Sequence, residues 1–294
     1  MPTLKETKGR IASVRNTLKI TSAMKLVASA KLRKAQQAIE AMRPYERQLQ
    51  AILAAASPKY AKILDAKPLE ESASTFSAQN RDTRPVAIVA VSSNSSLCGS
   101  FNTNVMAKVR SVRRPGDTVY AVGRKMADAM RREGFPSPED YSALADRPAY
   151  SPAASLVEHL AEEYEKGRVG GVLLVYNHFI SSAKQVPVVE WLLGAPEPSG
   201  EEDTTVVAPD TSDTIIEPNR KELLEELLPK TLKLKFYAAL LDSAAAEHSA
   251  RTVAMQTATD NAENLLEELT LQYNKGRQQK ITAEILDLAG GQMD

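Results

Sequence analysis

The sequence has a single cysteine, Cys98, among 294 residues. One thiol excludes an internal disulfide, and it excludes the cysteine clusters that hold structural zinc. The three histidines, at positions 159, 178 and 248, are too far apart in sequence to form a metal-binding spacing. We therefore predict no metal site and no disulfide framework.

Long apolar runs are also missing. The longest are short, such as residues 86–91, whereas a membrane-spanning helix needs about 20 apolar residues. The start, Met1-Pro2-Thr3-Leu4-Lys5, lacks the apolar centre of a signal peptide. Aromatic residues make up only 5% of the chain, which suits helices packed through Ala and Leu better than an all-β fold. We expect a soluble, cytosolic chain with no direct membrane insertion.

The formal net charge of zero conceals an uneven distribution. Residues 1–47 carry eleven Lys and Arg against three Glu, and residues 201–230 carry nine Asp and Glu against three basic residues. Opposite charge at two places suggests different partners for each. The basic segment lacks interleaved aromatics, so a solvated helix flank or a protein-binding surface competes with nucleic-acid binding.

Residues 219–288 are dense in helix formers and contain only Pro229 and Gly276 as breakers. Such a helix is on the order of 100 Å long, whereas a compact chain of this size is about 50 Å across. Alternating steps of three and four from Leu234 give a coiled-coil seam in which nine of twelve positions are apolar or small: Leu234, Tyr237, Leu241, Ala244, His248, Arg251, Met255, Ala258, Ala262, Leu265, Leu269 and Gln272.

Residues 3–57 predict a second long helix, with Pro44 expected to kink or locally break it. The same steps give Ile11, Val14, Leu18, Thr21, Lys25, Ala28, Leu32, Ala35, Ile39 and Met42. This is the only other segment long enough to pair with the C-terminal helix. We predict one antiparallel coiled coil of the two terminal helices, with a parallel homodimer of either helix as the alternative.

The period changes between the two helices. Strand candidates alternate with helical stretches: the strands at 86–91, 119–122, 171–175 and 186–193, and the helices at 103–112, 124–133 and 155–166. Pro187 favours an edge position in the sheet for the last strand. This order predicts a small doubly wound, Rossmann-like α/β domain. The predicted organisation is a coiled-coil helix at 1–57, a linker or excursion at 58–83, the α/β domain at 84–195, an acidic loop at 196–218 and a coiled-coil helix at 219–294.

The turn after the first strand, residues 92–102, is where such a domain would bind a nucleotide. It has a single glycine, Gly99, and matches neither phosphate-binding glycine motif, so hydroxyls capping the next helix are favoured. Cys98 has no base near it in sequence, and no other residues form a catalytic constellation. The alternatives are a nucleotide-binding α/β enzyme with helical arms and a coiled-coil scaffold that binds nucleic acid. From Tyr273 to Thr282 the apolar seam fades, which predicts either solvation or a pocket formed by other chains.

Several runs at both ends of the chain form recognisable motifs: residues 11–17, 20–28, 247–251, 258–262, 269–275 and 281–291, with residues 97–102 in the middle. With these runs the chain resembles the gamma subunits of the rotary, F-type ATP synthases of bacteria. The resemblance extends over the whole length, although Gly276 stands where alanine is usual in that family.

The resemblance implies a non-catalytic central-stalk rotor without a cofactor. It couples proton-driven rotation of the membrane c-ring to conformational cycling of the catalytic β subunits, inside a hetero-hexameric ring of α and β subunits. The epsilon subunit and the c-ring are the further partners, and nucleic acid is not one. The expected location is the cytoplasmic face of the bacterial inner membrane, as a peripheral part of the complex. The residues that match contact positions with β subunits are Met24, Lys25, Arg277, Gln278, Thr282 and Glu284.

Overall fold

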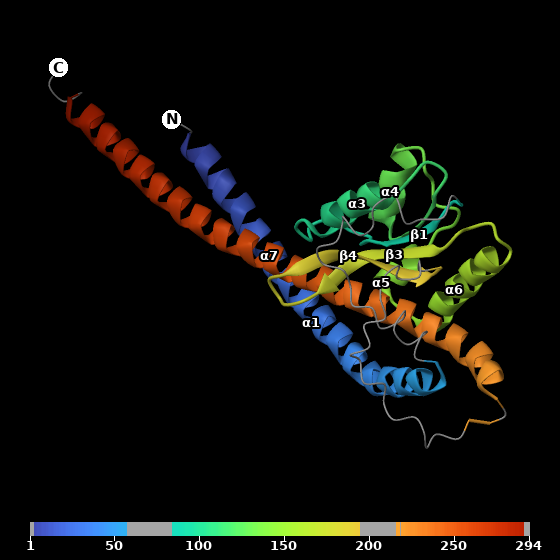
Figure 1. Ribbon diagram of the computed structural model, residues 1–294. Coiled ribbons are helices and arrows are strands. Elements are labelled where there is room, and N and C mark those ends of the chain that lie inside the picture. Colours follow the sequence, from blue (N-terminus) through green and yellow to red (C-terminus); the bar gives the residue numbers. More distant parts are fainter. Residues whose placement is uncertain (1–2, 58–83, 195–215, 218, 291–294) are drawn as a thin grey trace, which may run out of the picture. The chain divides into compact units, whose positions relative to one another are not determined.

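The computed structural model describes residues 3–57, 84–194, 216–217 and 219–290 (Figure 1). The chain forms two compact units, one of Met1–Ser29 with Arg251–Asp294 and one of Ala30–Ala250. The two longest helices, α1 (Leu4–Ala56) and α7 (Arg220–Gly290), contribute residues to both units. The predicted linker at 58–83 and most of the predicted acidic loop lie outside the described residues.

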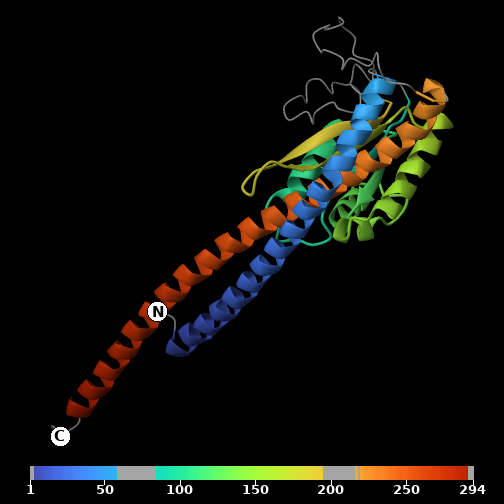
Figure 2. The same ribbon diagram turned by 90° about the horizontal axis from the view of Figure 1, so that it is seen from below.

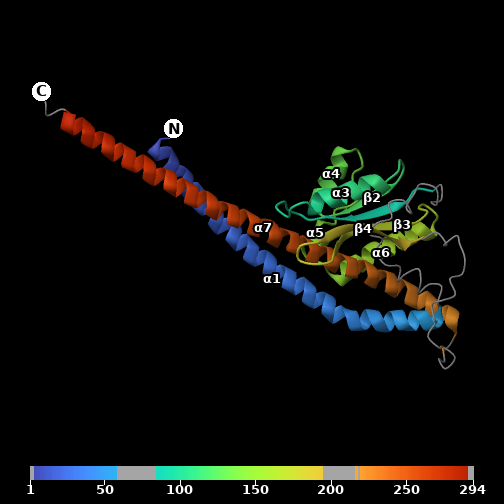
Figure 3. The same cartoon turned by 60° about the vertical axis from the view of Figure 1, so that its left-hand side comes forward.

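Helix α1 begins with a capping box. The Thr3 hydroxyl accepts a hydrogen bond from the Glu6 amide, and the Glu6 carboxylate accepts one from the Thr3 amide at 2.8 Å. This exchange satisfies amides that have no partner in the first turn. The helix continues through Pro44, and Figure 3 shows it bending in its lighter blue second half. The predicted helix and its kink are confirmed, without a break at the proline.

Helix α7 begins in a similar way. The Asn219 side chain accepts a hydrogen bond from the Glu222 amide and donates one to the Glu222 carboxylate. Asn219 therefore caps the N-terminus of the helix. The helix contains Pro229 and runs for 71 residues. Its bounds lie within two residues of those predicted from the helix-forming composition.

In the unit of Met1–Ser29 with Arg251–Asp294, the two helices lie side by side and run antiparallel (Figure 2). Lys25 contacts Gln256, Thr21 contacts Thr259, and Leu4 lies against Gly276, so the partner number rises as the α1 number falls. A Cβ on Gly276 would meet the Leu4 side chain at 3.2 Å, so this glycine allows a close approach. The predicted antiparallel pairing is confirmed.

The seam of α1 was predicted correctly in this unit. The seam of α7 was predicted correctly at Arg251, Met255, Ala262 and Leu269, but its alternate positions were wrong by one residue. Leu265 and Gln272 are exposed, whereas Leu266 and Tyr273 are half-buried and Thr259 is buried in place of Ala258. Both readings average 3.5 residues per step, so periodicity alone does not distinguish them. Leu265 and Leu266 are adjacent leucines, and from the sequence either of them fits the seam position equally well. In the structure Leu266 is the half-buried one, on the side of α7 that faces α1.

In the unit of Ala30–Ala250, a four-stranded sheet has the order β2-β1-β3-β4. Its strands are β1 (Ala87–Val91), β2 (Thr118–Val122), β3 (Val172–Phe179) and β4 (Gln185–Leu193). Strand β1 pairs in parallel with β2 and β3, while β4 pairs antiparallel with β3 as an edge strand that contains Pro187. The sheet is therefore mixed, and β3 extends four residues beyond the predicted end because the hairpin with β4 continues through its polar second half.

Helices cover both faces of the sheet. One face packs against α3 (Phe101–Val112) and α4 (Arg124–Arg132), with Val105, Val109, Met126 and Met130 buried. The other packs against α5 (Ser142–Asp146), α6 (Tyr150–Glu165) and the early part of α7, with Leu160 and Phe236 among its buried residues. This two-sided cover confirms the doubly wound class. Helix α5 was missed because five residues are too few to show a period.

The antiparallel register predicts a disulfide. The hydroxyl oxygens of Thr21 and Thr259 lie 3.0 Å apart and both side chains are buried. We expect Thr21→Cys with Thr259→Cys to form an intramolecular disulfide under mild oxidation, because the side chains approach within the reach that a disulfide requires. Mass spectrometry of unreduced peptides measures the link. Thr21→Cys with Thr257→Cys, on an exposed turn of α7, is the matched control, and equal oxidation of both pairs would contradict the register.

Candidate functional site

The polar side chains of the turn after β1 form hydrogen bonds with other parts of the same domain. The Asn94 side chain accepts from the Arg124 amide at 3.0 Å and donates to the Ser142 carbonyl at 2.8 Å. The Ser92 hydroxyl accepts from the Met126 amide at 3.0 Å. We expected these groups to cap the helix that follows directly, but they hold the first turn of α4 instead. The amides of Arg124 and Met126, at the start of α4, are therefore satisfied within the protein.

The buried thiol of Cys98 lies in the same turn. The Asn102 amide donates to its sulfur at 3.2 Å, and the Asn102 oxygen accepts from the Ser93 amide at 3.0 Å. Cys98 packs with Phe101 and with Ala246 of α7. The cysteine therefore fills an interior position, as its residue type favours.

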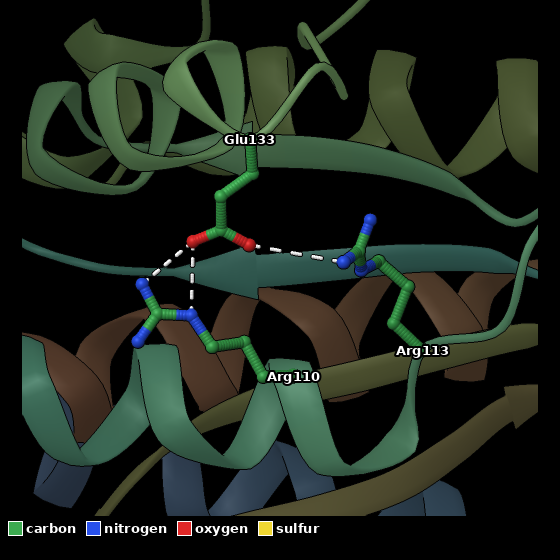
Figure 4. A network of polar contacts seen from close by, with 3 residues as sticks. All are labelled: Arg110, Arg113 and Glu133. Carbon is green, nitrogen blue, oxygen red and sulfur yellow. Dashed lines mark hydrogen bonds and ion pairs between the residues drawn. The ribbon is translucent and has the colours of Figure 1, made fainter.

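The ends of α3 and α4 are joined by a charged network (Figure 4). The Arg110 guanidinium donates twice to one oxygen of Glu133, at 2.6 and 2.9 Å, and Arg113 lies 3.7 Å from the other oxygen. The hydrogen bond with Glu133, and then its charge, raise the pKa of Arg110. Arg113 also stacks 3.5 Å from the centre of the Phe135 ring. These contacts fasten two helix ends together, and the described residues contain no cluster of three potential metal ligands.

Two of the predicted contact residues lie in α1. Met24 is half-buried, and the Lys25 ammonium donates to the Gln256 side chain of α7 at 2.8 Å. Lys25 therefore uses one of the three donors of its ammonium group within the helix pair. No finding tests the assignment of either residue to a β-subunit contact.

The other four predicted contact residues lie near the end of α7, and all are exposed. Thr282 donates to the Gln278 carbonyl within the helix, and Glu284 pairs with Lys280 at 3.6 Å. Among the residues that the structure describes, the Arg277 guanidinium has no hydrogen-bond or ion-pair partner. The helix thus presents Arg277 and Gln278 outward together, and their assignment as contacts stays a prediction.

Two exposed apolar stripes were not predicted from the sequence, because only the spacing of the inward-facing seam was considered there. Ile20 and Val27 are 60% and 59% exposed and flank Met24 on one face of α1. Ile281, Ile285 and Leu288, on α7, are 47%, 60% and 75% exposed. Both sets have the spacing of i, i+4 and i+7, which aligns them on one helix face. This spacing was the signal available in the sequence, and contiguous exposed apolar surface indicates a site for a partner.

Among the described helices, none combines the length and the apolar character that crossing a membrane requires.

Comparison with known proteins gives consistent matches along the chain. A family model described as ATP synthase matches residues 3–293. The ATP synthase gamma chain of Phocaeicola vulgatus is 46% identical over 302 residues, and that of Bacteroides thetaiotaomicron is 44% identical over 307, each alignment covering 100% of both chains. The gamma chain of Pelotomaculum thermopropionicum is 36% identical and covers 99% of this chain and 98% of its own.

Solved structures share the fold. A chain from the OSCP, F1 and c-ring part of the Euglena gracilis mitochondrial ATP synthase matches with a TM-score of 0.71 at 19% identity, covering 98% of this chain and 93% of its own. A chain from the rotor of the same enzyme matches with a TM-score of 0.67 at 20% identity, covering 95% and 98%. Terminal helices paired antiparallel, with an α/β domain between them in sequence, are the fold that this chain shares with those two ATP synthase chains. The chain belongs to the ATP synthase gamma chain family.

Proposed function

We propose that this chain is the central-stalk rotor subunit of a proton-translocating F-type ATP synthase. In this role it couples rotation of a membrane c-ring to the conformational cycling of catalytic β subunits. Full-length similarity to gamma chains supports the proposal. The observation that carries it is the end of α7, where every described side chain from Arg277 to Leu288 is exposed and apolar groups line one face. Such a surface suits a partner that surrounds the helix.

The chain itself performs no chemical step in this proposal. The turn after β1 uses its polar groups internally, and the ATP chemistry belongs to the β subunits. A helix that presents a different side at each rotational position makes different contacts with three otherwise equal sites. Differential contacts of that kind are what couples distant sites.

The proposed partners are the α and β subunits around the paired helices, with the epsilon subunit and the c-ring as the others. The proposed location is the cytoplasmic face of the bacterial inner membrane, where the chain is held through those subunits. Co-expression with tagged β and untagged α subunits tests the proposal. We expect recovery of all three chains in one complex, and recovery of α and β without this chain would contradict the role.

Arg277→Ala with Gln278→Ala should weaken coupled ATP turnover in the assembled complex by roughly tenfold. A guanidinium forms bidentate bonds to a carboxylate, and hydrogen bonds to charged groups contribute about 1.5–3 kcal/mol. ATP-driven proton pumping and ATP synthesis measure the change. Lys275→Ala with Gln279→Ala removes the same kinds of groups from neighbouring exposed positions and should change little. Equal effects of the two pairs would show that Arg277 and Gln278 make no special contact.

A further inference from the structure

Three polar residues of α7 contact the β3–β4 hairpin: Lys235, Asp242 and Ser249. They are spaced seven residues apart along the helix. A spacing of seven drifts by only about 20° per step around a helix, so the three residues lie on one face of α7. All three lie in the unit of Ala30–Ala250, together with the whole sheet. We call them the ladder residues.

The first contact is an ion pair inside the domain. The Lys235 ammonium lies 3.4 Å from one oxygen of Glu190 on β4, and the two side chains are 15% and 9% exposed. The Tyr176 hydroxyl on β3 donates to the other Glu190 oxygen at 2.7 Å. Burial, and then the charge of Glu190, raise the pKa of Tyr176, so the hydroxyl keeps its proton and remains a donor.

The second contact is at the end of β3. Asp242 accepts at both carboxylate oxygens, from the Phe179 amide at 3.1 Å and from the His178 ring at 2.5 Å. A carboxylate held by two neighbouring residues of a strand fixes the helix in position as well as in distance.

The third contact is at the hairpin turn. The buried Ser249 hydroxyl donates to the Ser182 carbonyl at 2.8 Å. The Gln185 side chain donates to the Ser249 oxygen at 3.4 Å. This contact holds the backbone of the turn rather than a long side chain, so little freedom remains in it.

The distance between successive ladder residues along α7 matches the distance between their partners along β3. Seven residues of helix rise about 10.5 Å, and the three residues from Tyr176 to Phe179 span about 10 Å of strand. The next step along α7 then reaches the turn at Ser182. Between Lys235 and Asp242 the buried apolar surface of α7 includes Phe236 and Leu240, whereas between Asp242 and Ser249 its buried apolar residues are Ala244, Ala245 and Ala246. Small side chains present low ridges, which resist rotation about the helix axis less than interlocked large ones.

We propose that the ladder residues fix the rotation and register of α7 on the β3–β4 hairpin, and that torque passes between the α/β domain and the helix through them. This inference rests on the proposed rotor role. Phe236, Leu240 and their neighbours hold the domain to the helix, whereas the ladder residues set its angle. Lys235, Asp242 and Ser249 are positioning residues and take no part in chemistry.

The test uses the complex assembled with α and β subunits fixed to a surface and a bead attached to the α/β domain through Thr103→Cys, an exposed position on α3. Lys235→Met with Asp242→Ala removes two contacts. We expect ATP hydrolysis without the bead to be unchanged and rotation of the bead to stall at a lower viscous drag than in the parent. Amide exchange at Phe179 should become roughly tenfold faster, the loss of about one hydrogen bond.

Lys233→Met with Asp260→Ala is the matched control. It also removes one lysine and one aspartate from α7, but Lys233 pairs with the largely exposed Glu158 of α6 and not with the β3–β4 hairpin. Asp260 accepts a hydrogen bond from Gln256, four residues away on the same helix. The control should stall at the same drag as the parent. Lys235→Arg with Asp242→Asn keeps a cation and an acceptor in place and should recover most of the torque.

The outcomes separate the two proposals. A parent chain that assembles but never rotates the bead contradicts the rotor role itself. A parent that rotates, beside a ladder variant with the same stall drag, overturns the inference and leaves the rotor role standing. Equal losses in the ladder and control variants also overturn it, because general weakening of α7 then explains the effect.

Discussion

Gly123→Ala should destabilise the α/β domain by about 3–5 kcal/mol, the combined cost of backbone strain and overpacking. Gly123 has φ of +103° at the start of α4, and a Cβ there would lie 2.3 Å from the Ser92 carbonyl oxygen. A backbone atom has no rotamer by which to escape, so the turn after β1 would have to move. That turn holds the first turns of α4 and α5, and the damage should spread to both.

Trp191 is the only tryptophan and lies in β4, so its fluorescence during urea unfolding reports on this domain. Gly116→Ala is the control. Gly116 has φ of +95°, but a Cβ there would meet nothing within 4 Å, so only the strain of about 1 kcal/mol remains. Equal losses at the two glycines would show that the close approach of Ser92 adds little to the cost of the Gly123 substitution.

Phe236→Ala should also destabilise the chain by about 3–5 kcal/mol, because a large buried side chain leaves a cavity that its neighbours only partly fill. Phe236 is fully buried where α7 packs against the sheet and α6. It is the largest of the fully buried side chains among the described residues. Its loss removes the main apolar contact that holds the domain to the helix.

Thermal unfolding followed through Trp191 measures the effect, and hydrogen exchange along α7 locates it. Val253→Ala, at a position 45% exposed on the same helix, should stay within about 0.5 kcal/mol of the parent. A loss of less than about 1 kcal/mol for Phe236→Ala would mean that the domain holds α7 mainly through polar contacts.

The sequence predicted both long helices because their apolar spacing persists over many turns and both begin at residues that cap well. The parallel core strands were equally clear, since continuous apolar runs leave little alternative. The second half of β3 was not predicted, because Tyr176, Asn177 and His178 look polar until the hairpin with β4 is formed. The phase of the α7 seam depends on which of two adjacent leucines meets α1.

Some residues of the candidate site were likewise found from the sequence, and others were not. Arg277 and Gln278 were found by resemblance, and the structure adds only that both are exposed. The partners of Asp242 lie more than sixty residues away in sequence, and no local pattern links them. Contacts of this kind follow from the packing of α7 on the sheet, which a one-dimensional pattern does not contain.

Gly276 is half-buried against Leu4, in the first turn of α1. The twelve residues from Arg277 to Leu288 then stand as a single exposed helix. Isolated helices shorter than about 12–15 residues are marginal in water. This segment continues a helix that is already formed, so no new nucleation is needed, but no packing holds its last turns against fraying. The helical fraction of the segment in the free chain scales the apparent affinity for any partner that binds the helical form. Binding of a partner to these last turns is therefore coupled thermodynamically to their ordering as helix.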